Sequence, residues 1–535
     1  MNIPAIKDAD TVLVNKVYTA LSQLKHINVE QYEARLEYEL EIISEKEYEN
    51  YFLIVADYVQ YAKTHNIKVA PGRGSCVSSL VAFLLGITEI DPVKYNLMFE
   101  RFLSMDRLEM PDIDIDVEAG KRDALIQYII NKYGYNQVAR FLDNTERGIH
   151  QSGIVIANVD LSQANTIEKD NMLVLNYPQD EVEESLVKFD ILSSKVLSYI
   201  KELEIVTGDI ISIKDNDFDD KFVYKLLHTK LLAGLFQVSS PLYQQRLCNL
   251  QINSIEKLAD ALALIRAPFL KEKLDIQYMN QSIKNINKEY DAITESTNGV
   301  LLYQEQLIEL LYAYNFSMKE AYTVMKTLAK GDSIEDYKSK FFANCNQNAL
   351  AVWNIINNMG LYSFNKAHAI AYATLVYVTV YYKVYYTKEF YAVMLTKAYK
   401  NKDNTNIKKL QRELKQLQIQ LLMPEFTKSK YECTVELKGI RLGLVAISGI
   451  NKQAAIKLLN SESLLDNDVR TVTLAIFAGV FDEVCEGMWR YKIYHEFMEA
   501  KGLKPKETFS IGNKVSFVYC DSNQVLNNKI MKIEE

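Results

Sequence analysis

The sequence has 535 residues, of which 48% are hydrophobic and 24% charged, so its composition excludes a disordered chain and allows several packed domains. The formal net charge of −8 excludes a global basic field, so any contact with nucleic acid must come from local lysine and arginine clusters. The six cysteines lie far apart without a CxxC pair, which argues against a disulfide framework or zinc site and favours reduced thiols in the cytoplasm.

The first part of the chain predicts an α/β domain. Residues 1–29 form a short leader that lacks the basic start and apolar core of a secretory signal. Apolar stripes between acidic residues predict helices over 29–65. A glycine-rich turn at 71–75 then precedes the apolar run 80–86, which predicts a turn that feeds the N-terminus of a buried helix. Alternating patterns predict strands at 110–117 and 186–192.

The strand predicted at 110–117 carries three carboxylates. Its period of two places Asp112, Asp114 and Asp116 on one face and the isoleucines on the other. Such a stripe of like charge is costly unless a cation neutralises it. Carboxylate oxygens suit Mg²⁺, which stabilises the charge that develops in phosphoryl transfer. An exposed strand with a solvated acidic face would show the same pattern, so the octet alone leaves both interpretations open.

Two further features suit a phosphate ligand. On the strand predicted at 186–192, Lys188 and Asp190 project from one face, which indicates either a phosphate contact beside a metal ligand or a surface salt bridge. The turn through Gly74 and Ser75 offers backbone N–H groups, a hydroxyl and a helix N-terminus to a triphosphate, although such turns are often structural. The sequence has no GxxxxGK[ST] motif, so this turn is not a Walker loop.

Beyond residue 193 the pattern is mostly helical, with few glycines or prolines, and it includes a basic amphipathic stretch at 407–421. The apolar run 369–382 is too short to span a bilayer, which predicts a buried helix and no membrane partner. Residues 447–451 resemble a helix-hairpin-helix turn, in which Asn451 stands where a second glycine is usual. Residues 503–535 form a C-terminal tail without a recognisable role.

Taken in chain order, several segments together resemble the bacterial DNA polymerase III alpha family, or C-family, and its DnaE-type branch in particular. They are PGRGSCVSSLVAFLLGITEIDP, FERFLSMDRLEMPDIDIDV, LVKFDIL, GLFQVSS, LADALALIRAP, GVLLYQEQ, SFNKAHAIAYA and AIFAGVFDEV, across roughly residues 30 to 490. The resemblance implies an α/β palm of the polymerase β-like nucleotidyltransferase type at 30–193. It also implies a large, mostly α-helical fingers domain at 194–430, whose end at 431–502 holds the hairpin-like segment.

The resemblance also implies a site. Asp112, Asp114 and Asp190 would be the catalytic residues and would hold two Mg²⁺ ions, with Asp116 as a neighbour. The implied nucleotide- and phosphate-binding residues are Gly74, Ser75, Arg101, Arg107, Lys188, Lys326, Lys330, His368 and Tyr372. His368 and Tyr372 are spaced i, i+4 and so share a helix face, where Tyr372 is suited to stack on a base. Asn365 and Lys366 belong to the same motif as second-rank candidates.

The sequence departs from the family in several places. It lacks the histidine-rich metal-binding domain with which the family normally begins, the thumb expected near 141–147, and room for an oligonucleotide-binding barrel and tail. The missing thumb predicts weak, strongly salt-dependent DNA binding and low processivity. Met325 and Lys326 replace an arginine pair, which puts nucleotide affinity in doubt because lysine lacks the bidentate fork of arginine.

These features predict a cytoplasmic DNA-directed DNA polymerase whose partners are primer–template DNA and deoxynucleoside triphosphates. A sliding clamp or other replication proteins are further partners to consider, although no clamp-binding motif stands out. The alternative is a catalytically weak paralogue that serves as a DNA- or polymerase-binding subunit. A transferase that works without a template is a third reading.

Overall fold

A computed structural model of the protein describes residues 2–25, 27–107, 110–145, 148–281, 285–345, 347–359, 364–485 and 488–505. These residues form two compact units. The first comprises residues 2–198, 211–228 and 245–378, and the second comprises residues 199–210, 229–244 and 379–505. Within these ranges, no helix is both long and apolar enough to cross a membrane.

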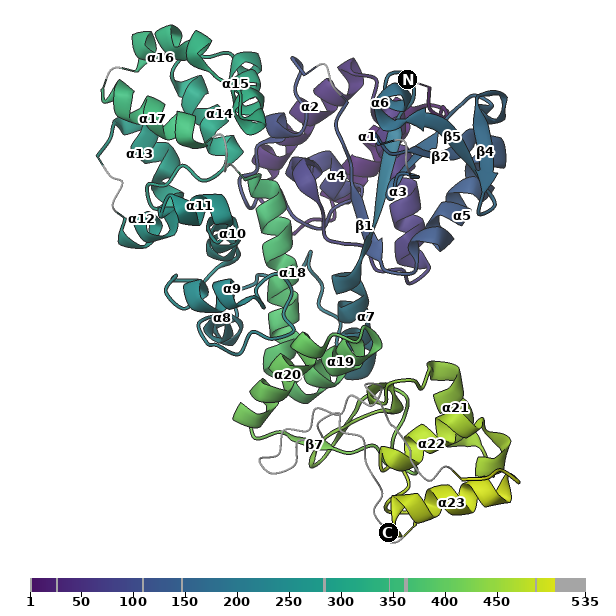
Figure 1. Ribbon diagram of the computed structural model, residues 1–535. Coiled ribbons are helices and arrows are strands. Elements are labelled where there is room, and N and C mark those ends of the chain that lie inside the picture. The colour runs from purple at the N-terminus through teal and green to yellow at the C-terminus, as the bar shows by residue number, and fades with distance from the viewer. Residues whose placement is uncertain are drawn as a thin grey trace. The chain divides into compact units, whose positions relative to one another are not determined.

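The first unit contains a six-stranded mixed sheet in the order β1-β6-β3-β2-β5-β4. Figure 1 labels β1, β2, β4 and β5 of this sheet. Its strands are β1 Ile115–Glu118, β2 Val138–Leu142, β3 Gly153–Ile156, β4 Thr166–Lys169, β5 Met172–Pro178 and β6 Lys188–Ser194. Strand β6 pairs in parallel with β1, with Ile115 opposite Ile191, and antiparallel with β3, with Gly153 opposite Asp190. Adjacent parallel strands begin at the same end, so residues that precede β1 lie beside the start of β6.

Helices surround this sheet and continue beyond it. Those up to β6 are α1 Ala9–Leu21, α2 Val29–Glu45, α3 Glu49–Thr64, α4 Leu80–Leu84, α5 Arg122–Tyr133 and α6 Gln179–Glu183. Helix α5 contacts β2 and β6 of the sheet, and α3 packs against α5. Three helices have residues in both units, namely α7 Lys195–Thr207, α9 Pro241–Leu247 and α18 Lys366–Tyr385.

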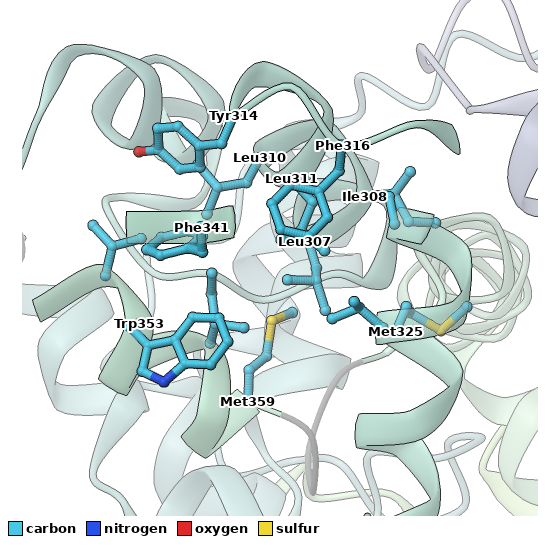
Figure 2. Close-up of a cluster of buried hydrophobic side chains, with 14 of the residues drawn as sticks. Leu307, Ile308, Leu310, Leu311, Tyr314, Phe316, Met325, Phe341, Trp353 and Met359 are labelled. Carbon is cyan, nitrogen blue, oxygen red and sulfur yellow. The ribbon is translucent and has the colours of Figure 1, made fainter. Parts of the chain in front are cut away.

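A second hydrophobic core lies among the later helices of the first unit. The helices that contribute to this core are α13 Lys288–Thr294, α14 Gln304–Ala313, α15 Met318–Lys330, α16 Lys338–Asn344 and α17 Ala349–Met359. Helices α8 Lys221–Leu227, α10 Ile255–Leu264, α11 Ala267–Lys271 and α12 Leu274–Asn280 precede them in the chain. Figure 2 shows this core, in which Phe341 packs edge-on against Tyr314 and tilted against Trp353, each with ring centroids 5.1 Å apart. This helical core therefore has its own aromatic centre, apart from the sheet.

The second unit contains five helices and a small sheet. The helices are α19 Thr387–Lys400, α20 Asn404–Gln416, α21 Lys452–Asn460, α22 Val469–Phe477 and α23 Arg490–Ala500. The three strands, in the order β7-β9-β8, are Gln420–Leu422, Gly439–Arg441 and Thr434–Glu436.

A buried ion pair joins α18 to α20, because Lys383 Nζ lies 2.7 Å from Glu413 Oε2. Tyr391 donates a 2.5 Å hydrogen bond to the same oxygen, and the backbone N–H of Ala233 donates to Glu413 Oε1. The buried carboxylate is therefore fully satisfied.

The predicted succession of an α/β region and a mostly helical region is confirmed. The strand expected at 186–192 is β6, shifted by two residues, and the run 369–382 lies within α18, where most of its residues are buried. The strand expected at 110–117 is wrong in its first half, since β1 begins only at Ile115. Pro111 has no N–H to donate, and the N–H of Ile113 donates to the hydroxyl of Tyr51 rather than to a neighbouring strand.

The sequence singles out three further segments, namely the expected thumb position, the hairpin-like segment and the C-terminal tail. The connection between β2 and β3 spans residues 143–152, and residues 146–147 of the predicted thumb position lie outside the described part. The hairpin-like segment follows a 3₁₀ turn at Leu444–Ala446, and Asn451 has φ −85° and accepts from the N–H of Ala454 as the N-cap of α21. Residues 506–535 of the tail also lie outside the described part.

The buried ion pair predicts a large asymmetry between single and double substitution. Glu413→Ala leaves the ammonium of Lys383 buried without its partner, so we expect the free energy of unfolding to fall by about 3–5 kcal/mol in urea titrations at pH 7. Lys383→Met combined with Glu413→Leu removes both charges and is expected to regain most of this loss. A Glu413→Ala protein as stable as the wild type would contradict the assignment.

Candidate active site

The register of two parallel strands brings the predicted catalytic carboxylates together. Asp114 immediately precedes β1, and Asp190 lies near the start of β6. Because Ile115 pairs with Ile191, Asp114 and Asp190 lie beside each other on adjacent strands. Asp112 lies two residues earlier in the chain, close enough for its charge to act on Asp114 together with that of Asp190. The three residues therefore form one acidic edge of the sheet.

Crowding and burial make the negative charge of this edge costly. Burial raises the pKa of Asp114 to about 6, and the charges of Asp190 and Asp112 contribute to the rise. Asp112 is exposed, yet the protein around it displaces enough water to raise the pKa of its carboxyl group, although the cation of Lys188 opposes the effect. Both carboxylates would therefore gain from a nearby positive charge, as the alternating sequence predicts.

Asp190 is held by partners that the sequence only partly indicates. Its Oδ2 lies 3.1 Å from the ammonium of Lys188, which also lies 3.0 Å from Glu183. Its Oδ1 accepts a 2.8 Å hydrogen bond from the hydroxyl of Ser152. Burial alone would lower the pKa of Lys188, but Asp190 and Glu183 outweigh it and raise that pKa. The ion pair is the alternative that the sequence left open for Lys188, and in this conformation Lys188 balances the charge of the acidic edge.

Arg73 joins the site although it was not among the predicted site residues. Its guanidinium lies 3.3 Å from both carboxylate oxygens of Asp116 and 3.6 Å from Asp114 Oδ2, and it donates to the hydroxyl of Tyr372. The side chain of Asp116 is only 6% exposed, and Arg73 compensates its buried charge. The side chain of Asp112, at the other end of the three aspartates, is exposed. The sequence signal that could have found Arg73 is its position inside the glycine-rich turn.

The glycine-rich turn contacts the helix that carries His368 and Tyr372. The N–H of Gly74 donates a 3.2 Å hydrogen bond to Nδ1 of His368, and Gly74 has φ +64°, which glycine adopts without strain. Burial lowers the pKa of His368 to about 4, with the charges of Arg73 and Arg266 adding to the effect, so the imidazole is neutral and accepts this bond. The rings of His368 and Tyr372 lie 4.2 Å apart on one face of α18, as their spacing predicts.

The N-terminus of α4 is not free to bind a triphosphate, which corrects the expectation drawn from the turn. The carboxylate of Glu39 accepts hydrogen bonds from the N–H groups of Leu80 and Val81, at 2.9 and 3.0 Å, and from the hydroxyl of Ser79. Ser75 lies instead in a separate 3₁₀ helix, Gly74–Ser78. Four residues, 76–79, separate the glycine-rich turn from the start of α4, a spacing that the sequence pattern did not reveal.

Three of the predicted phosphate-binding cations surround one aromatic ring. Arg101, Arg107 and Lys326 lie 6.0, 5.6 and 5.5 Å from the centre of the Tyr322 ring. Within the described residues, Nε of Arg107 is buried without a hydrogen-bond partner. Arg107 also counteracts the raised pKa of Asp112 and so lies near the acidic edge. Converging cations with an unsatisfied buried donor form a suitable site for an anion.

The remaining predicted cation, Lys330, is exposed in the last turn of α15, one helical turn beyond Lys326. Gln304 holds Arg101, because its Oε1 accepts from Nε at 2.9 Å and from Nη2 at 2.7 Å. The structure thus brings Arg101, Arg107 and Lys326 together and leaves Lys330 at the edge of the group.

A buried acid fixes the start of α18. Glu305 is 3% exposed, and its carboxylate accepts from the N–H of Lys366 and from the side-chain amide of Asn365, all at 3.0 Å. The ammonium of Lys366 donates to the carbonyl of Tyr95, and Asn365 Oδ1 accepts from the N–H of His368. Asn365 and Lys366 therefore position the helix, and Glu305 is a positioning residue that sequence reasoning missed.

The acidic edge offers the chemistry of a magnesium site. Asp112, Asp114 and Asp190 supply oxygen ligands of the kind that Mg²⁺ prefers, and their mutual repulsion is what a divalent cation would neutralise. As the side chains stand, the part of the chain described here contains no group of three or more His, Cys, Asp or Glu placed to hold a metal ion. The ammonium of Lys188 lies where it partly offsets this charge.

Comparison with known proteins identifies similarity over most of the chain. The family model for the bacterial DNA polymerase III alpha NTPase domain matches residues 11–146, and that for the alpha subunit finger domain matches residues 194–349. DNA polymerase III subunit alpha of Thermotoga maritima is 31% identical over 85% of this chain and 59% of its own length. The subunits of Aquifex aeolicus and Staphylococcus aureus are each 28% identical, covering 85% and 86% of this chain. The chain spans about half the length of these curated relatives.

The raised pKa of Asp114 predicts a pH-dependent gain of stability on its neutralisation. Because the folded state binds this proton more tightly than the unfolded state, its stability falls as the pH rises through about 6. In the absence of divalent cations, we expect Asp114→Asn to raise the free energy of unfolding by on the order of 2 kcal/mol at pH 7.5 and to have little effect at pH 4.

Urea unfolding at both pH values measures this difference, and the exposed Asp332→Asn provides the matched control. A gain for Asp114→Asn that is equal at pH 4 and pH 7.5 would count against a raised pKa.

Proposed function

Because the chain belongs to the bacterial DNA polymerase III alpha family, we propose that it is a DNA-directed DNA polymerase that adds deoxynucleotides to a primer 3′-hydroxyl. The observation that carries the proposal is an acidic sheet edge next to the cations around Tyr322. Nucleotidyl transfer needs both, since metal ligands and triphosphate ligands must meet at the reacting phosphate. In this proposal residues 30–193 form the palm and residues 194–430 the fingers.

In this proposal, different residues of the site bind the metal ions and balance the charge of the carboxylates. Asp112, Asp114 and Asp190 would hold the divalent cations. Cations bound there would supply Lewis-acid activation of the primer hydroxyl and neutralise charge on the leaving pyrophosphate. Lys188 balances the charge of Asp190 while no cation is bound, and Arg73 is held ready by Asp116.

The other residues hold the incoming nucleotide. Arg101, Arg107 and Lys326 bind the oxygens of the triphosphate, with Lys330 beside them. Tyr372 stacks on the base, and Ser75 and the N–H of Gly74 bind phosphate once His368 releases that N–H. The site in this conformation is therefore partly occupied by its own side chains.

The short connection between β2 and β3 supports low processivity. Residues 143–152 leave no space for a domain at the position where the family inserts its thumb. Without that contact, grip on primer–template DNA rests on fewer phosphate contacts and weakens steeply with salt. The same feature favours the second candidate, a DNA- or polymerase-binding subunit, if catalysis is absent.

Primer extension tests the catalytic assignment. With Mg²⁺ and one templated nucleotide at low salt, we expect the wild type to extend a primer, and Asp112→Asn and Asp190→Asn each to lower the rate more than about a hundredfold. Mg²⁺ should also raise the thermal midpoint of the wild type and have less effect on Asp190→Asn. The exposed Asp123→Asn is the control.

The possible outcomes separate the three readings. Absence of extension by folded wild type with bound template would favour the binding subunit. Incorporation that ignores the template base would favour a transferase, and full activity of Asp190→Asn would overturn the site.

The lysine that replaces an arginine predicts a change in nucleotide affinity. Lys326→Ala is expected to raise KM for the nucleotide about tenfold, because one charged phosphate contact is lost. Lys326→Arg should lower KM below that of the wild type, since a guanidinium binds phosphate through two donors. Steady-state incorporation kinetics measure both, with the exposed Lys319→Ala on the same helix as control. Equal KM values for Lys326→Ala and the wild type would remove Lys326 from the site.

A further inference from the structure

The outer face of α20 carries an uncompensated group of cations. Lys408, Arg412 and Lys415 are exposed, and Lys409 is partly exposed. Glu413, the one acid within Asn404–Gln416, points into the core and is only 6% exposed. The helix therefore presents positive charge alone on its outer face, in a chain whose formal net charge is −8.

No contact within the described ranges neutralises this face. The side chains of Lys408, Lys409, Arg412 and Lys415 form no ion pair or hydrogen bond with any residue that the structure describes. The cations of the preceding helix α19 behave differently. Lys397 pairs with Glu202, Lys400 lies 3.5 Å from Glu432, and Lys388 donates to the carbonyl of Leu437. Unpaired charge is thus concentrated on α20.

The packing of α20 fixes which way its cations point. Ile407, Leu410 and Leu414 are each 1% exposed, on the face opposite the cations. Rotation of the helix would also withdraw Glu413 from the ammonium of Lys383 and leave both charges buried without a partner. The basic face is therefore presented to solvent by a rigid scaffold.

The spacing and chemistry of the face suit a polyanion with repeated charges. Lys408, Arg412 and Lys415 follow one another at i, i+4 and i+7, which places them about 6 and 10 Å along the helix axis. The helix buries its own apolar face and exposes no large apolar side chain before Leu417, so it has little to insert into a membrane.

We propose that the outer face of α20 binds the phosphate backbone of DNA without sequence preference. The charge and packing of α20 support a polyanion site, and the choice of DNA rests on the proposed polymerase function. Each cation would displace condensed counterions from DNA, so the surface contributes affinity that falls with salt. Such contacts would supply grip to a chain whose β2–β3 connection is short.

The test compares two variants with equal net charge. One replaces Lys408, Lys409, Arg412 and Lys415 by glutamine, and the control replaces the exposed Lys7, Lys16, Lys121 and Lys319 by glutamine. Fluorescence anisotropy with labelled primer–template duplex gives the slope of log Kobs against log salt concentration. We expect the α20 variant to reduce the magnitude of this slope by about 3 to 4, at roughly 0.9 for each of the four lost cations, and the control to change it little.

A third variant distinguishes the loss of positive charge from a disturbance of the fold by substitution. Lys408→Arg, Lys409→Arg and Lys415→Arg together keep the charge and should keep the wild-type slope. Single-turnover incorporation at saturating DNA should be unchanged in the α20 variant, because the surface adds binding and not chemistry.

An unchanged salt slope in the α20 glutamine variant would overturn the proposal. Binding of the wild type to anionic phospholipid vesicles, lost in the α20 variant while its DNA slope is unchanged, would assign the face to a membrane instead. Because the slope reports binding alone, it remains interpretable if the wild type fails to extend a primer, so failure of the surface and failure of the polymerase assignment are distinguishable.

Discussion

Repulsion among carboxylates at the end of two parallel strands is the constraint around which the first unit is organised. The pairing of Ile115 with Ile191 places Asp114 beside Asp190, and burial raises the pKa of Asp114 to about 6. A fold that maintains such an edge must supply positive charge. Lys188 lies against Asp190, and Arg73 lies between Asp114 and Asp116. In the proposed polymerase, a divalent cation would neutralise the remaining negative charge of this edge.

Buried acids at helix starts then align the surrounding elements. Glu39 accepts from the first two N–H groups of α4, and Glu305 accepts from the first N–H of α18. A carboxylate is favourable at a helix N-terminus because it meets free N–H groups and the positive end of the helix dipole. Glu305 thereby sets the position of His368, whose neutral ring reaches Gly74. The glycine-rich turn and α18 are thus coupled through hydrogen bonds that a nucleotide would have to exchange.

The second unit uses charge in a different way. There a lysine and a glutamate are buried together, and Lys383, Glu413 and Tyr391 satisfy one another. This arrangement anchors α20 by its inner face and leaves its outer face uniformly basic. Local accumulation of cations on an acidic chain gives a DNA-binding surface without a basic protein overall.

Local patterns in the sequence determined much of this protein. The order of its motifs indicated the family, the alternation after Met110 placed Asp112, Asp114 and Asp116 on one side, and i, i+4 spacing paired His368 with Tyr372. These features depend on residues close together in the chain, so backbone periodicity alone specifies them.

Tertiary structure decided which groups meet across the fold. The local side chains of Ser79 and Asn365 cap α4 and α18. Three further hydrogen bonds are long-range: that of Ile113 to Tyr51 before the late start of β1, that of Leu80 to Glu39 and that of Lys366 to Glu305. Each joins residues about 40 or more positions apart, and no local pattern names such a partner. Only packing of the whole chain brings a buried carboxylate to the helix end whose N–H groups it satisfies.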